Sequence, residues 1–301
     1  MVGLLLAPLM LLFILWPFVL WSREHSCALS EIGERTSIPE GRKPVKLSVI
    51  VPAYNETERL PAMMKEALAY LIDRRNNEPK YTWEVIVVDD HSKDETFDLA
   101  TSFNTEATPV YAFRLRKNSG KGGAVRAGAL QAVGETVLMV DADGATRFSE
   151  ISRLEAAFSS SGNGSSVEVA FGSRDHLRKA ESVQKRSPIR NMLMYFFHLA
   201  VLGIIGTHIK DTQCGFKLFS RRASRILFGS LHLQRWAFDT EIVLLCQMLN
   251  FKVAEVDVDW TEIEGSKLNV AIASVQMLRD MILLRLLYLL AVWCPSFPRD
   301  E

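Results

Sequence analysis

The sequence has no surplus of charge of either sign. It carries 35 Lys and Arg residues and 35 Asp and Glu residues, so its formal net charge is zero. A nucleic-acid-binding surface would need an excess of basic residues, so no nucleic-acid partner is expected and any basic site must be local. Cysteine is also scarce, with four widely spaced residues and no Cys-x-x-Cys pair. This spacing suggests neither a zinc knuckle nor a disulfide framework, and it favours a reducing compartment.

Two common chemical signatures are missing as well. The histidines show no metal-ligand spacing, so none is assigned a role. The glycine-rich stretch 118–126, Asn-Ser-Gly-Lys-Gly-Gly-Ala-Val-Arg, lacks the spacing of a P-loop and has Gly122 where Ser or Thr should stand, which argues against a P-loop NTPase. Glycines before a helix still allow close backbone approach, so Lys121 and Arg126 are candidates to face a diphosphate.

A long apolar run opens the chain. No charged residue occurs from Val2 to Trp21, and about 20 helical residues span the ~30 Å hydrocarbon core of a bilayer. Because no Lys or Arg precedes the run, residues 1–22 are predicted to be an uncleaved anchor rather than a cleaved signal peptide. Basic residues follow it, so the positive-inside rule predicts that the rest of the chain faces the cytoplasm. The polar residues 23–44 are expected to form a linker.

Residues 45–267 alternate between apolar runs and helix-like periodicity. This alternation predicts an α/β domain with a Rossmann-like, mostly parallel sheet and right-handed crossovers. The expected strands cover residues 46–53, 83–89, 110–115, 136–140, 167–172, 216–219 and 253–260. The expected helices cover residues 57–74, 94–102, 120–133 and 151–158.

Two later stretches are strongly apolar. Residues 191–205 are too few to span a bilayer comfortably. Residues 268–301 contain a long helix pattern in which Arg279, Asp280 and Arg285 would lie mid-span, where charges are costly. We therefore expect this helix to lie in the membrane interface or on the core, and a second crossing is the alternative.

Acidic residues follow three of the predicted strands. Pro52-Ala-Tyr-Asn-Glu56 comes after the first strand, Asp89-Asp90 after the second, and Asp141-Ala-Asp143 after the fourth. The carboxyl ends of strands line the ligand crevice of an open α/β sheet. Asp141 and Asp143 would suit Mg²⁺ or Mn²⁺, with a diphosphate supplying further oxygen ligands. The alternative is that these residues are ordinary turn and helix-capping residues.

Taken in order, these motifs resemble the family-2 inverting glycosyltransferases of the GT-A fold. Downstream, Gly172-Ser-Arg174, Asp211-Thr-Gln-Cys-Gly-Phe-Lys217 and Trp236-Ala-Phe-Asp-Thr-Glu241 resemble the branch that glycosylates polyprenyl phosphates. The resemblance covers roughly residues 45–267. It implies a metal-dependent enzyme of the endoplasmic reticulum membrane that transfers glucose from UDP-glucose to dolichyl phosphate. Two alternatives remain open: the same fold with GDP-mannose as donor, and an inactive membrane-tethered scaffold.

The resemblance also implies a role for individual residues. Those implied to bind the sugar nucleotide are Pro52, Tyr54, Glu56, Asp90 and Asp141, beside the candidates Lys121 and Arg126. Asp141 and Asp143 would hold the metal, and Asp211 and Asp239 would lie near the reacting carbon. Those implied to meet the acceptor phosphate are Arg174, Lys185, Arg186, Arg190 and Lys267. His232 stands where the processive synthases of the family have the Gln of Gln-x-x-Arg-Trp, which argues against a polymerase.

Overall fold

The computed structural model describes residues 32–159, 166–177, 203–263 and 270–295. Within these ranges the strands form one eight-stranded sheet of order β1-β4-β3-β2-β5-β7-β6-β8. The strands are β1 (Ile32–Thr36), β2 (Val45–Ala53), β3 (Trp83–Asp89), β4 (Val110–Leu115), β5 (Gly134–Val140), β6 (Val169–Ser173), β7 (Phe216–Ser220) and β8 (Val253–Asp257). The helices are α2 (Leu60–Asn77), α3 (Thr96–Ser102), α4 (Lys121–Gln131), α5 (Ile151–Ser159), α8 (Arg221–Ser230), α9 (Phe238–Met248) and α10 (Val270–Leu289).

The centre of the sheet is parallel. Strands β4, β3, β2 and β5 all run in one direction, β6 and β8 are parallel to each other, and β1 and β7 run antiparallel to their neighbours. Strand β3 is buried at every position, as expected where helices cover both faces of a parallel sheet. The prediction of an α/β domain with a mostly parallel sheet is therefore confirmed.

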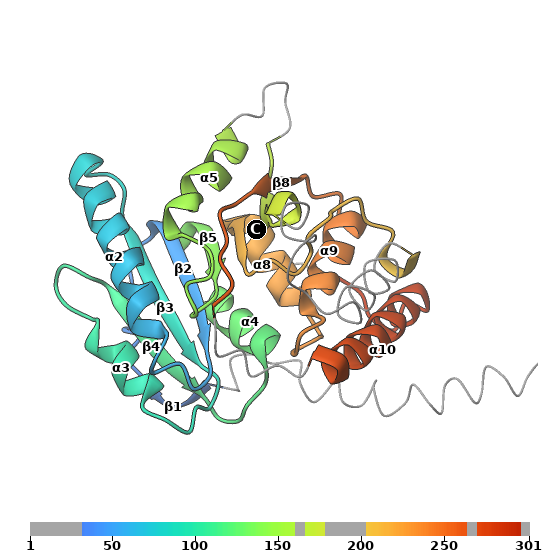
Figure 1. The fold of residues 1–301 in the computed structure, drawn as a ribbon, viewed down its shortest axis with the longest axis horizontal. Coiled ribbons are helices and arrows are strands. Elements are labelled where there is room, and N and C mark those ends of the chain that lie inside the picture. The colour runs from blue at the N-terminus through green and yellow to red at the C-terminus, as the bar shows by residue number, and fades with distance from the viewer. Residues whose placement is uncertain (1–31, 160–165, 178–202, 264–269, 296–301) are drawn as a thin grey trace, which may run out of the picture.

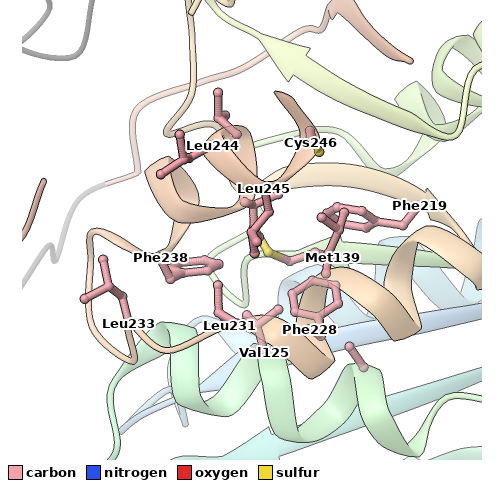
Figure 2. Close-up of a cluster of buried hydrophobic side chains, with 14 of the residues drawn as sticks. Val125, Met139, Phe219, Phe228, Leu231, Leu233, Phe238, Leu244, Leu245 and Cys246 are labelled. Atoms are coloured by element: carbon pink, nitrogen blue, oxygen red, sulfur yellow. The ribbon is translucent and has the colours of Figure 1, made fainter. Parts of the chain in front are cut away.

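Side-chain alternation along the strands divides the core into two layers. In β2, Leu47, Val49 and Val51 point to the face covered by α2, α3 and α5, whereas Ile50 points to the face covered by α4, α8, α9 and α10. Figure 1 shows the two groups of helices on opposite sides of the sheet. In Figure 2, Phe228 from α8 and Leu245 from α9 lie against Val125 of α4 and Met139 of β5. Helices therefore cover both faces of the central strands.

One prediction for the linker is wrong. Residues 32–36 form β1, which pairs antiparallel with β4 at the edge of the sheet. A Cβ on Gly33 would lie 2.9 Å from the Arg114 carbonyl oxygen, so this glycine permits the close approach. The sequence of β1 has little strand character of its own, and the free edge of β4 supplies its hydrogen-bonding partner.

Helix α10 packs on the domain. Its residues Met277, Met281, Leu284 and Leu287 are buried in the core cluster that also contains α9. Among the described residues, no helix has both the length and the apolar character that crossing a bilayer requires. The predicted anchor at 1–22 lies outside the described residues, as do residues 191–202 of the first apolar stretch.

Candidate active site

The candidate site lies along one edge of the sheet, at the carboxyl ends of the parallel strands β2, β3 and β5. Because β2 and β3 are parallel and in register, Ala53 lies opposite Asp89, and the loops that follow both strands meet. Strand β7 starts at this edge, since Phe216 lies opposite Val140, the last residue of β5. Strand β6 also ends there, immediately before Arg174. Segments that are far apart in sequence therefore converge on one edge.

The loops after β2 and β3 are tied to each other. Asn55 has a left-handed backbone (φ 55°); its N–H donates to Ser92 Oγ at 2.9 Å, and its Oδ1 accepts from Lys93 N–H at 2.7 Å. Glu56 is not a free carboxylate, because Arg59 Nε donates to its Oε2 at 2.8 Å. The helix that was predicted to begin at residue 57 begins at Leu60, after this loop. Pro52 and Tyr54 are half-buried beside this loop.

Asp90 anchors the glycine-rich loop. Only 4% of its surface is exposed. Its Oδ1 accepts from Ser119 N–H at 2.7 Å, and its Oδ2 accepts from Gly120 N–H at 2.8 Å. Burial raises the pKa of Asp90 to about 6, and these two hydrogen bonds only partly oppose it. Both carboxylate oxygens thus hold the backbone of this loop in place, and the predicted contact of Asp90 with the sugar nucleotide stays a prediction.

The glycines of this loop allow close packing against protein. A Cβ on Gly122 would lie 2.6 Å from Phe238 Cβ, and Gly123 N–H donates to the Gln234 carbonyl at 2.8 Å. Arg126 points into the domain, where it is 6% exposed and its Nε donates to the Phe228 carbonyl of α8 at 2.9 Å. The prediction that Arg126 faces a diphosphate is therefore wrong, because its guanidinium is buried between α4 and α8 and binds the protein itself.

Asp141 and Asp143 lie together at the end of β5. Lys121 Nζ lies 2.5 Å from Asp141 Oδ1, and Arg59 Nη1 lies 4.0 Å from Asp143 Oδ2. The two carboxylate side chains are 33% and 29% exposed. Burial, followed by the charge of Asp141, raises the pKa of Asp143. Two partly exposed carboxylates that repel each other fit a divalent cation chemically. The described residues contain no third carboxylate, His or Cys close enough to complete a protein-only metal cage.

The main chain at Gly215 restricts the position of the Asp141 carboxylate. A Cβ added to Gly215 would lie 1.9 Å from Asp141 Oδ2, so no other residue can stand there without displacing the carboxylate. Gly215 precedes β7, and this part of the chain therefore closes over the end of β5. The rotamer of a candidate metal ligand is thus restricted by main chain from a distant segment.

Two further ion pairs complete the edge. Arg174 binds Asp211 through both oxygens, with Nε to Oδ2 at 2.7 Å and Nη2 to Oδ1 at 2.9 Å. Although burial opposes it, Asp211 raises the pKa of Arg174 above its usual range. Lys217 Nζ lies 2.5 Å from Asp239 Oδ1 in the first turn of α9. Lys185, Arg186, Arg190 and Lys267 lie outside the described residues, so their predicted contacts stay predictions.

Two residues of this edge were not predicted from the sequence. Lys217 ends the motif that begins at Asp211, but its partner Asp239 is 22 residues away, which leaves no local signal. Arg59 stands three residues after Glu56, and opposite charges at this spacing meet on a helix. The spacing could therefore have indicated the ion pair between Arg59 and Glu56.

Comparison with known proteins identifies the family. The sequence pattern of the family described as "Glycosyl transferase family 2" matches residues 48–228, from β2 into α8. The chain belongs to glycosyl transferase family 2.

Relatives within the family match most of the chain. It is 45% identical over 262 residues to the dolichyl-phosphate beta-glucosyltransferase of Dictyostelium discoideum, covering 85% of this chain and 80% of the relative. It is also 45% identical over 275 residues to the Homo sapiens protein of the same name, covering 90% and 85%. Glucosyl-3-phosphoglycerate synthase from Mycobacterium tuberculosis, solved with Mn²⁺ and UDP-glucose, has a TM-score of 0.51 at 19% identity, covering 88% of this chain and 82% of its own. That likeness shows the predicted GT-A fold.

Proposed function

We propose that this family-2 glycosyltransferase transfers glucose from UDP-glucose to dolichyl phosphate with inversion, giving dolichyl β-D-glucosyl phosphate for N-glycan precursor assembly. The observation that carries the proposal is the 45% identity to dolichyl-phosphate beta-glucosyltransferases over at least 80% of their length. A match of that extent includes every segment that meets at the candidate active-site edge.

The donor lies across the ends of β2, β3 and β5. Pro52 and Tyr54 stand in the loop after β2, where a nucleobase would be received. Asp141 and Asp143 would hold Mg²⁺ or Mn²⁺, which would neutralise the charge that develops on the departing diphosphate. Mn²⁺ in a solved protein of the same fold supports this assignment. Lys121, at the start of α4, places a cation beside the same carboxylates.

The transfer step needs no strong base. A phosphate acceptor has a second pKa of about 6, so it is mostly dianionic at neutral pH and attacks as it stands. An acceptor oxygen forms a bond to the anomeric carbon while the bond from that carbon to the diphosphate breaks, and the electron pair leaves with UDP. Positive charge develops on the sugar ring, and in this proposal the Asp239 carboxylate stabilises it.

The acceptor approaches from a membrane surface. Arg174 contributes the described part of the acceptor-phosphate site, and Lys185, Arg186, Arg190 and Lys267 complete it in this proposal. The predicted anchor at 1–22 holds the enzyme in the endoplasmic reticulum membrane as a single-pass protein with its catalytic domain in the cytoplasm. The exposed large apolar residues near the C-terminus support an interfacial position for residues 268–301. They are Leu278, Ile282, Leu289, Leu290 and Val292.

A donor panel tests the proposal directly. The purified full chain is incubated with dolichyl phosphate, Mg²⁺ or Mn²⁺, and one of UDP-glucose, UDP-galactose or GDP-mannose. We expect a glucosyl phospholipid with UDP-glucose and at least 10-fold less product with the other donors. A preference for GDP-mannose would contradict the choice of donor, and the absence of transfer from every donor would favour an inactive scaffold.

A further inference from the structure

Lys217 is a fully buried charged residue next to the proposed catalytic edge. Its relative exposure is 0%, so its ammonium group has no access to substrate. Its Nζ donates to Asp239 Oδ1 at 2.5 Å and to the Cys214 carbonyl at 2.6 Å, and it lies 5.2 Å from the centre of the Phe171 ring. Any effect of Lys217 on the reaction must therefore be transmitted through a neighbour.

The side chains that pack against Lys217 in the sheet are apolar and do not require a charged residue at this position. In the sheet it lies opposite Met139 of β5 and Phe171 of β6, both buried and apolar. An apolar residue would continue this layer. Buried ion pairs are also poor stabilisers, because desolvating two charges offsets most of their attraction, and apolar replacements of the pair are often neutral or better. Stability alone is thus a weak reason for the lysine.

The neighbour on which the Lys217 charge acts is the Asp239 carboxylate. It is 2% exposed and stands in the first turn of α9, where the helix dipole favours a negative charge. Burial raises its pKa, and the charges of Lys217 and Lys121 oppose this effect while Asp141 adds to it. Lys217 on β7, Lys121 on α4 and Asp141 after β5 are the charged groups that act on it. Lys217 is the one that hydrogen-bonds to it.

We infer that Lys217 is a positioning residue, which holds the Asp239 carboxylate as an anion in one orientation toward the anomeric carbon. This inference rests on the proposed glycosyl transfer, and it deepens that proposal by naming the group that prepares Asp239. By contrast, the side chain of Arg174 is 20% exposed and is proposed to meet the acceptor phosphate itself. Lys217 cannot reach a substrate, so in this inference it acts through Asp239.

The first test is Lys217→Met in the full chain, which keeps the length of the side chain and removes its charge. We expect kcat to fall by about 10²-fold or more, as for the loss of one preorganised electrostatic group. The Kd for UDP-glucose should stay within about threefold of the wild-type value. The acidic limb of the kcat profile should move to higher pH, because Asp239 without its lysine takes up a proton more readily. A lower Tm with unchanged kcat and unchanged pH profile would overturn the inference.

A double-mutant cycle separates an action through Asp239 from an independent one. If Lys217 acts only through Asp239, adding Lys217→Met to Asp239→Asn lowers kcat by no more than about threefold further. If the two losses multiply, Lys217 has a separate function and the inference fails. Lys217→Gln, which removes the charge but keeps a hydrogen-bond donor, serves as a second variant should Lys217→Met not fold, and the same loss of kcat is expected.

Arg42→Met is the matched control. Arg42 pairs with the buried Glu84 near the start of β3, at the opposite end of the sheet from the site. We expect this variant to lose Tm without losing kcat. If Asp239→Asn is fully active, the role of Asp239 is wrong and the inference falls with it. If the wild type uses another sugar nucleotide, the proposed donor fails instead, and the same cycle is measured with that donor.

Discussion

Asp90 allows a quantitative prediction from its buried position. In the folded protein its pKa is raised to about 6 from an ordinary value of 3.8. The folded state therefore binds this proton more tightly than the unfolded state does. The resulting stabilisation is fully present below the unfolded pKa and is lost as the pH rises through the folded pKa. Asp90→Asn removes the titration and keeps the shape of the side chain.

The magnitude follows from linkage between protonation and folding. With pKa values of about 6 and about 4, the wild type should gain about 1.3 kcal/mol of unfolding free energy from Asp90 between pH 7 and pH 5. The variant gains nothing from this position. The free-energy difference between wild type and Asp90→Asn should therefore move by that amount in favour of the wild type. Denaturant unfolding of both proteins at the two pH values measures it.

Asp94 provides a control of opposite sign. Despite partial burial, hydrogen bonds from Thr96 and Thr57 lower the pKa of Asp94 below its ordinary value of 3.8. Its contribution to stability is therefore present above that value and lost as the pH falls below it, so the wild-type advantage over Asp94→Asn does not grow between pH 7 and pH 5. A pH-independent difference for Asp90→Asn would refute the reasoning. A wild-type advantage that is largest at pH 7 would show that the Ser119 and Gly120 hydrogen bonds outweigh burial.

Three further predictions concern the metal, the acceptor and the topology. Asp143→Ala should abolish turnover with little change in Tm, because this carboxylate is partly exposed; full activity of the variant, or undiminished wild-type activity in excess chelator, contradicts the metal assignment. Arg174→Ala should raise the KM for lipid phosphate while UDP-glucose binding stays nearly unchanged. It should also cost about 3–5 kcal/mol of stability by removing the guanidinium that pairs with the buried Asp211, and an unchanged lipid dependence refutes the acceptor contact. The sequons at Asn55 and Asn163 should remain unmodified in cells, and a glycosidase-sensitive mass shift would reverse the proposed orientation.

The main elements of the fold were predictable because their signals are local. Strands such as β3 and β5 are continuous apolar runs that end in turn residues, and this pattern needs no knowledge of the partner strands. Strand β1 was missed because its partner is the edge of β4, about 80 residues later in the chain. Helices α8 and α9 were also missed, because the sequence after residue 149 shows a less regular apolar periodicity than the first half of the domain.

The candidate site was predictable in its location and less so in its contacts. The strand-end rule correctly brings the loop after β2, Asp90 and Asp141 to one edge. The partners of polar residues depend on chain segments that meet only after folding. Asp90 binds the backbone of Ser119, and Arg126 binds the carbonyl of Phe228, 102 residues away. No spacing within either motif indicates these contacts with the protein itself.

Gly215 has a consequence for how this enzyme can change. With a methyl group at this position only 1.9 Å from Asp141 Oδ2, even alanine would push a candidate metal ligand out of place. In a library of all single substitutions, position 215 should therefore be as intolerant as the carboxylates themselves, although it has no functional group. Attempts to alter donor preference by varying the Asp211–Lys217 segment must therefore keep this glycine.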